Sequence, residues 1–113
     1  MICDFGDVVV VPFPFVDMAV VKRRPALVLS VAAFNDDNQQ SIMAMLTTAA
    51  GSSWPTDIAI DDLASAGLKR PSVLRWKLFT LPNDMIAGKA GKLAASDRAK
   101  ISAALTNILA VPQ

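Results

Sequence analysis

Three consecutive cations, Lys22, Arg23 and Arg24, precede Pro25 and an unbroken apolar segment at residues 26–29. Proline lacks a backbone N–H and disfavours a helical conformation in the residue before it. The pattern therefore predicts a strand that begins at Pro25, with Arg24 extended at its mouth. A guanidinium held on such a rigid element can bind a phosphate through two hydrogen bonds. The alternative is a solvated charge run at the end of a loop.

The charges are unevenly distributed along the chain, although the formal net charge is only +1. A second basic cluster follows the first within residues 69–77: Lys69, Arg70, Arg75 and Lys77. Most aspartates lie in other segments, so the two clusters can form one basic face of the kind that phosphate binding uses.

The inventory of side chains excludes several kinds of chemistry. The chain has no histidine and no tyrosine, all ten of its acidic residues are aspartate, and Cys3 is its only cysteine. Histidine, glutamate and clustered cysteine carry much of the known acid–base and metal chemistry, so we expect no metal and no cofactor. Cys3 has no histidine to activate it and is expected to be an inert thiol in a reducing compartment.

Apolar runs bounded by proline, glycine and asparagine predict short strands. They cover residues 8–11, 25–31, 41–46, 56–60 and 72–81, with a short ladder at 88–93, a turn at 33–38, and a helical turn at 61–66 that Gly67 ends. Thr47 and Thr48 follow the third strand, where their hydroxyls can face a groove. Ordinary β-branched edge residues are the alternative interpretation of this pair.

A long helix is predicted near the end of the chain, before Pro112. Ser96 is expected to be its N-cap, and Asp97 lies in the first turn, where the helix dipole favours an anion. An apolar stripe follows at helical spacing: Ile101, Ala104, Leu105, Ile108 and Leu109. Short strands followed by a terminal helix predict the α+β class, as a small β-barrel with a C-terminal helix packed on it.

The length of 113 residues predicts a single domain over residues 1–113. Apolar residues make up 53% of the chain and its mean hydropathy is +0.42, a surplus for so small a core. This surplus and the apolar loop at 13–21 predict a subunit interface, and hence a homodimer. We also expect a cytoplasmic protein, because no apolar run matches a membrane span and the first residues lack a signal-peptide pattern.

An ordered set of short motifs then covers nearly the whole chain. The motifs are Gly6-Asp7-Val8-Val9, Pro12-Phe13-Pro14-Phe15, the segment from Arg23-Arg24-Pro25 to Ser30, Thr47-Thr48, residues 67–72, residues 77–81 and Gly91-Lys92-Leu93. Together they resemble the MazF/PemK toxins of type II toxin–antitoxin systems. The resemblance implies an SH3-like barrel, a homodimer, growth inhibition, and an antitoxin that occupies the substrate groove. It also implies a metal-independent, sequence-specific endoribonuclease that cleaves single-stranded mRNA without the ribosome.

The resemblance implies two catalytic residues, Arg24 and Thr47. Arg24 would stabilise the charge that develops on the phosphate during attack by the neighbouring 2′-OH, and Thr47 would hold a phosphate oxygen. Some members of the family place a histidine or glutamate near the arginine as a general base, and this chain has neither. Asp17 is the only nearby carboxylate. Asp17 as the base, deprotonation by solvent, and an inactive descendant all remain open.

The resemblance also implies a path for RNA, along cations and hydroxyls that contact the phosphates and an aromatic ring that stacks on bases. The predicted RNA-binding residues are Arg23, Thr48, Arg70, Ser72, Arg75, Trp76 and Lys77. Trp76 is the first stacking candidate, with a core position as its alternative, and Trp54 is a weaker one.

Two other functions remain open at this point. One is a toxin that binds DNA gyrase without catalysis, because the barrel also resembles that of the CcdB gyrase poisons. The other is an RNA- or partner-binding barrel that has lost activity. The Arg24 and Thr47 pair favours the nuclease.

Overall fold

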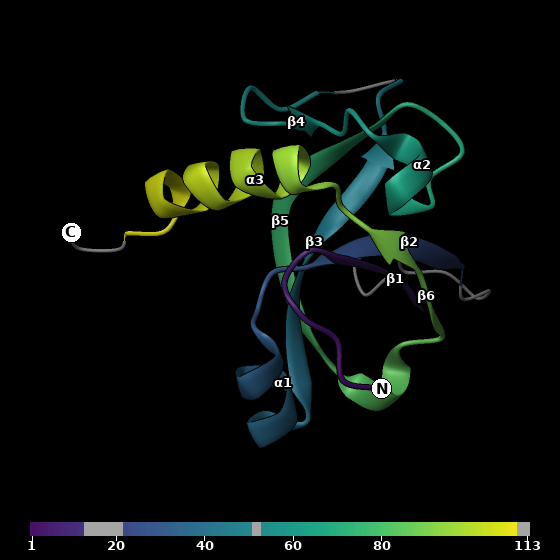
Figure 1. The fold of residues 1–113 in the computed structure, drawn as a ribbon, viewed down its shortest axis with the longest axis vertical. Helices are drawn as coiled ribbons and strands as arrows, with labels where there is room; N and C mark the ends of the chain where they lie inside the picture. The colour runs from purple at the N-terminus through teal and green to yellow at the C-terminus, as the bar shows by residue number, and fades with distance from the viewer. Residues whose placement is uncertain (13–21, 51–52, 111–113) are drawn as a thin grey trace.

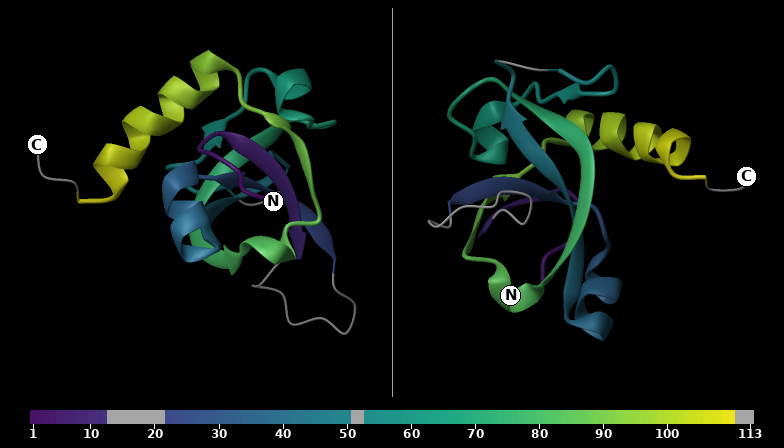
Figure 2. Two further views of the ribbon diagram at one scale, coloured as in Figure 1. Left: turned by 60° about the horizontal axis from the view of Figure 1, so that its bottom comes forward. Right: turned by 180° about the vertical axis from the view of Figure 1, so that it is seen from behind.

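A sheet of short antiparallel strands dominates the computed structural model, which describes residues 1–12, 22–50 and 53–110. The strands are β1 (Asp7–Pro12), β2 (Arg23–Val28), β3 (Gln40–Thr48), β4 (Ile58–Ala59), β5 (Ser72–Pro82) and β6 (Gly88–Lys92). The helices are α1 (Ala32–Asn38), α2 (Leu63–Ala66), the 3-10 turn η1 (Asn83–Met85) and α3 (Ala95–Ile108). The six strands pair in the order β4-β5-β3-β2-β1-β6. The sheet curls strongly, and α3 leaves it as a projecting rod (Figure 1, Figure 2).

Both faces of this sheet are buried at its centre. Alternate residues of β1 enter different clusters, so that Val8 and Val9 are both fully buried. The helix-side core contains Val8, Leu27, Ala44, Leu46, Leu74, Trp76 and Ile101 of α3. The opposite core contains Cys3, Val9, Val11, Ala26, Val28, Met43 and Phe79. Because side chains alternate along a strand, membership of a core shows which face of the sheet each residue takes.

The prediction of the α+β class, with a small β-barrel and a C-terminal helix packed on it, is confirmed: the strands form a curled antiparallel sheet, and α3 packs on it through Ile101. Strand boundaries differ by a few residues: β2 already begins at Arg23 and ends at Val28, and β4 has only two residues. Pro25 lies opposite Val10 of β1, but the ladder to β3 begins only at Ala26, so Pro25 is tolerated because it is at the edge on the β3 side. Over the described ranges of the chain, no helix is long and apolar enough to cross a membrane.

The turn expected at residues 33–38 is wrong, because this segment is the helix α1. Its fully buried Asn35 donates hydrogen bonds to the carbonyls of Cys3 (2.9 Å) and Ser30 (3.1 Å). Asn83 of η1 donates to the carbonyl of Asn35 (2.8 Å) and accepts from the hydroxyl of Ser41 (2.6 Å). This buried polar network joins segments far apart in sequence, so local turn residues alone did not reveal the helix.

Gly67 ends α2 as predicted, in the left-handed conformation with φ +70°. A Cβ atom at this position would lie 2.1 Å from the carbonyl oxygen of Ala90 in β6. Glycine is therefore required both by the backbone conformation and by the close approach of α2 to β6.

The expected N-cap of the last helix is wrong. Ala94 occupies that position and makes no side-chain cap, whereas Asp97 in the first turn is fully buried. The Asp97 carboxylate accepts hydrogen bonds from the backbone N–H groups of Asp61 (3.1 Å) and Asp62 (3.0 Å), and Lys100 lies 3.3 Å from it. Asp97 thus fastens the segment between β4 and α2 to α3.

Candidate functional site

Arg24 lies on β2, where it pairs with Val11 of β1 and is exposed. On the other side of β2 the register pairs Ala26 with Met45, Leu27 with Ala44 and Val28 with Met43 of β3. The ladder ends at the Ala26–Met45 pair, so Arg24 and Thr47 each lie two residues beyond this last β2–β3 pair, at the same end of the ladder. The two sequence-predicted catalytic residues therefore share one end of neighbouring strands.

The same register also gives their orientation. Arg24 shares a face with Val11 and Ala26, which belong to the opposite core. Thr47, two residues beyond Met45, shares the face of Met45, which packs against that core. Arg24 and Thr47 thus project from the same face of the sheet, away from the side that α3 covers.

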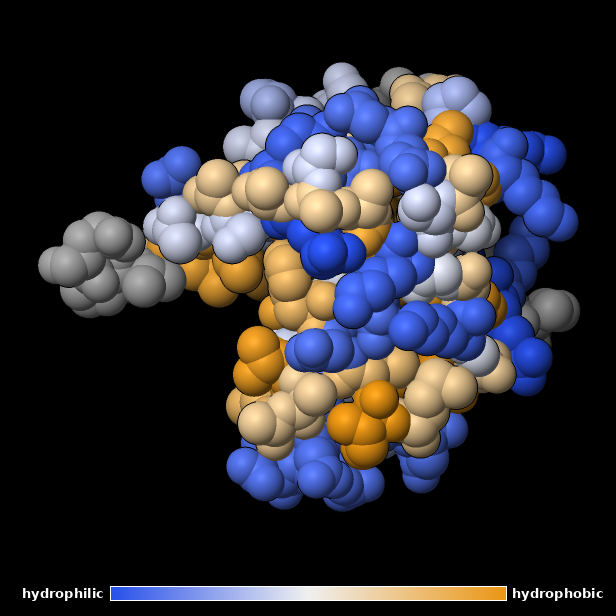
Figure 3. All heavy atoms as spheres, viewed as in Figure 1, coloured by the Kyte–Doolittle hydropathy of each residue, from blue (hydrophilic) through white to orange (hydrophobic). Residues whose placement is uncertain are grey.

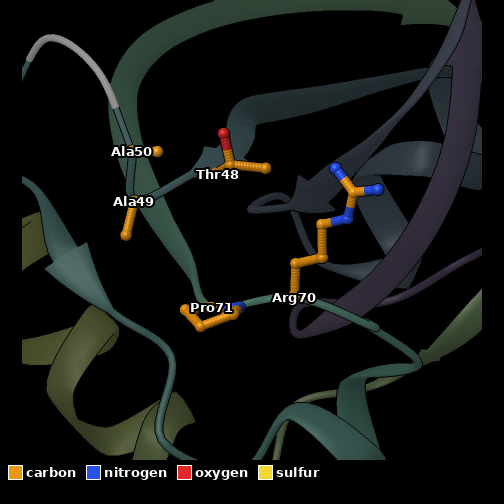
Figure 4. Close-up of a pocket in the computed structure, with 5 residues that line it drawn as sticks. All are labelled: Thr48, Ala49, Ala50, Arg70 and Pro71. Atoms are coloured by element: carbon orange, nitrogen blue, oxygen red, sulfur yellow. The ribbon is translucent and has the colours of Figure 1, made fainter.

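Thr48 and Arg70 line a cavity of about 490 Å³ together with Ala49, Ala50 and Pro71. The polar ends of Thr48 and Arg70 point toward the same side of this cavity, and the other residues supply its apolar lining (Figure 4). Thr48 directly follows Thr47 in β3, so alternation along the strand turns its side chain to the other face of the sheet from Thr47. The cavity brings two of the predicted RNA-binding residues together.

Arg75 of β5 is held by a carboxylate that the sequence analysis did not single out. Its guanidinium donates to Asp57 through Nε (3.1 Å) and Nη2 (2.8 Å), and the side chains of Arg75 and Asp57 are only 10% and 9% exposed. Hydrogen bonds from Arg75 lower the pKa of Asp57, against the opposing effect of burial. A contact of Arg75 with RNA remains a prediction.

The predicted stacking role of Trp76 is wrong. Trp76 is buried in the helix-side core, and its indole N–H donates to the carbonyl of Thr56 (3.1 Å). It lies in a bulge of β5, since Ala44 pairs with Leu78 but the next residue of β3, Met45, pairs with Arg75. Trp54 is instead the exposed tryptophan. The local sequence did not separate the two, because both lie next to polar residues.

The remaining predicted residues are dispersed. Ser72 is buried, and its hydroxyl donates to the carbonyl of Arg70 (2.8 Å). Lys77 is half-buried in the β5 bulge, and Arg23 is exposed beside Pro12 at the start of β2. Asp17, the candidate general base, lies outside the described residues, as does the apolar loop at 13–21.

The described part of the chain is thus a small antiparallel half-barrel, in which β2 and β3 carry Arg24 and Thr47 at one end. It matches the family model of the PemK-like, MazF-like toxins of type II toxin–antitoxin systems over residues 4–109. The chain therefore belongs to this toxin family, as the sequence motifs predicted.

Solved structures show the same fold. A MazE–MazF complex from Deinococcus radiodurans aligns with a TM-score of 0.77 and 22% identity over 99% of this chain and 100% of that chain. A mycobacterial endoribonuclease in complex with its cognate antitoxin aligns with a TM-score of 0.75 and 21% identity over 99% and 97%. The Mycobacterium tuberculosis toxin MazF-mt6 aligns with a TM-score of 0.73 and 22% identity over 95% and 99%. No curated protein sequence matches the chain.

Proposed function

We propose that this toxin is an endoribonuclease that cleaves single-stranded mRNA in the cytoplasm at a specific sequence and thereby inhibits growth. The observation that carries the proposal is that Arg24 and Thr47 each lie two residues beyond the last β2–β3 pair, and that alternation along their strands puts them on one face. An arginine and a hydroxyl at the same end of neighbouring strands can hold two oxygens of one phosphate.

The proposed reaction is a transesterification. The 2′-OH adjacent to the scissile phosphate loses its proton and attacks the phosphorus, the bond to the 5′ oxygen breaks, and the departing oxygen takes up a proton. Arg24 stabilises the charge on the non-bridging oxygens and hydrogen-bonds or protonates the leaving oxygen, while Thr47 orients the phosphate. Asp17 or solvent receives the proton of the 2′-OH.

Cleavage is expected to continue in excess EDTA, because the substrate supplies its own nucleophile and the sequence lacks histidine and glutamate. The products should carry a 2′,3′-cyclic phosphate and a 5′-hydroxyl, which mass spectrometry of the cut RNA measures. An RNA with one deoxyribose at the scissile position should bind without being cut. If EDTA abolished the activity and magnesium restored it, the reaction would be metal-assisted and this mechanism would be contradicted. Growth inhibition without any RNA cleavage would favour gyrase binding.

We also propose that a cognate antitoxin binds across the same surface as the RNA. Two of the similar structures are named as complexes, one of MazE with MazF and one of an endoribonuclease with its cognate antitoxin. The basic and hydroxyl-bearing surface proposed for RNA also suits carboxylates of an acidic segment. A complex that still bound and cut RNA normally would contradict this proposal.

The protein is expected to be a homodimer in solution. Ile108 and Leu109 at the end of α3 are 38% and 44% exposed, and Leu29, Ile42, Leu78, Leu105 and Leu109 line an apolar hollow of about 100 Å³. Hydrophobic atoms gather beneath the projecting helix (Figure 3). Obligate interfaces often bury about 2,000 Å² or more.

Light scattering with the single change Ile108→Asp tests the dimer. The wild-type mass should be that of two chains, and the variant should shift toward one chain because a carboxylate is costly to bury at an apolar contact. Thr106→Asp, on an exposed site of the same helix, is the matched control and should keep the dimer mass. A monomeric wild-type protein at micromolar concentration would contradict the prediction.

A further inference from the structure

Trp54 is held in place although the residue is 42% exposed. Its backbone N–H donates to the Asp57 carboxylate (3.0 Å), and its carbonyl accepts from the backbone N–H of Asp57 (3.0 Å). These two bonds close a tight turn just before β4. A large apolar ring is thereby presented to solvent on a defined backbone.

The ring itself is supported by Arg75. The guanidinium carbon of Arg75 lies over the indole, 5.5 Å from the ring centroid, within the range of a cation–π contact. The same guanidinium is fixed by its two hydrogen bonds to Asp57. Arg75 therefore covers one face of the indole, and the exposed area of Trp54 lies on the remaining surface of the ring.

This Trp54–Asp57–Arg75 cluster stands beside the proposed catalytic pair. Arg75 pairs with Met45, and Met45 lies two residues before Thr47 on the same face of β3. Arg24, Thr47 and Arg75 thus project from one face of three adjacent strands, β2, β3 and β5. Strands lie about 4.8 Å apart, so the cluster is about 10 Å across the sheet from β2.

We propose that Trp54 is a stacking platform for one nucleobase of the bound RNA, and that Arg75 and Asp57 are positioning residues that hold the platform. The inference rests on the proposed RNA cleavage. Proteins recognise single-stranded RNA partly by stacking its bases on aromatic rings, and a ring that is already fixed loses less conformational entropy on binding than a mobile one. Of the two tryptophans, the exposed Trp54 takes the role that the sequence suggested for Trp76.

The test uses an RNA that contains the cleavage site mapped for the wild-type protein, with 2′-O-methyl groups at every ribose so that it binds without reacting. Trp54→Ala should weaken binding by about 5- to 100-fold, the usual range for one stacked base. Trp54→Phe keeps a ring and should recover most of the affinity. Circular dichroism and light scattering should match the wild type.

An abasic series then locates the base. One nucleotide at a time is replaced by an abasic residue. The affinity of the wild-type protein should fall most when the base stacked on Trp54 is missing. The affinity of the Trp54→Ala variant should not change when that base is removed. Asp57→Asn should weaken binding by a similar factor, and combined with Trp54→Ala it should cause no further loss, because both changes remove one contact.

Three results would overturn the proposal. The first is RNA affinity unchanged in Trp54→Ala. The second is that the Trp54→Ala variant loses affinity by the same factor at every abasic position. The third is a smaller particle mass for this variant, which would assign Trp54 to a protein interface. Failure of the proposed function itself is distinguishable, because the wild-type protein would then neither cut nor bind the RNA.

Discussion

Replacing Arg24 with alanine is expected to lower kcat for RNA cleavage by about 10²- to 10³-fold, the usual cost of removing one donor that stabilises transition-state charge. Growth inhibition on expression should disappear with it. The fold should persist, because Arg24 is exposed at the end of β2 and contributes little buried surface. Single-turnover cleavage of the mapped RNA measures the rate, and thermal unfolding monitors the fold.

Arg23→Ala is the matched control for this change. Arg23 is the adjacent exposed cation on β2, but alternation along the strand turns it to the other face from Arg24. Its loss should raise KM through a weaker phosphate contact and leave kcat nearly unchanged. Arg24→Lys keeps the charge without the planar fork and should recover only part of kcat. Arg24→Ala protein that cut RNA at near the wild-type rate would mean that the active site lies elsewhere.

The largest effect on stability is expected from Asp97→Ala. The substitution would leave the backbone N–H groups of Asp61 and Asp62 without their acceptor and would remove the buried partner of Lys100. Hydrogen bonds to a charged group contribute about 1.5–3 kcal/mol each, so the free energy of unfolding should fall by about 3 kcal/mol or more. Urea unfolding followed by circular dichroism measures it.

Asp61→Ala is the control, because Asp61 binds the same ammonium of Lys100 (2.9 Å) but its side chain is 72% exposed. An exposed ion pair contributes at most about 1 kcal/mol, so this variant should remain close to the wild type. Equal losses for Asp97→Ala and Asp61→Ala would show that the buried hydrogen bonds at Asp97 do not stabilise the fold.

The stability that Asp97 contributes should depend on pH. Burial raises the pKa of its carboxyl, but the N–H groups of Asp62 and Asp61 and the ammonium of Lys100 together lower it below its usual value. The contribution is therefore fully present above the unfolded pKa of about 3.9 and is lost as the pH falls through the lower, folded pKa. Asp97→Asn should flatten this acid dependence, and an unchanged acid midpoint would contradict the assignment.

The strands, the terminal helix and the toxin family were predictable from the sequence because their signals are local. Runs such as Val8–Val11 restrict the backbone residue by residue, and Gly67 meets a requirement set by its own φ angle. The Arg24-Pro25 pair likewise indicates an extended chain through steric contact between neighbours. Motifs of this kind keep their meaning wherever they occur in a chain, so their order was enough to identify the family.

The tertiary structure alone decided which side chains lie on the proposed RNA-binding surface and which are buried. The pair formed by Arg75 and Asp57 spans 18 positions, and the bonds that bury Asp97 reach 35 and 36 positions along the chain. The two-residue bulge in β5 decides which residue of β3 lies opposite each residue of β5. Trp54 and Trp76 differ in exposure because of these distant contacts, and no pattern of neighbouring residues records them, since burial is a property of what the folded chain brings together.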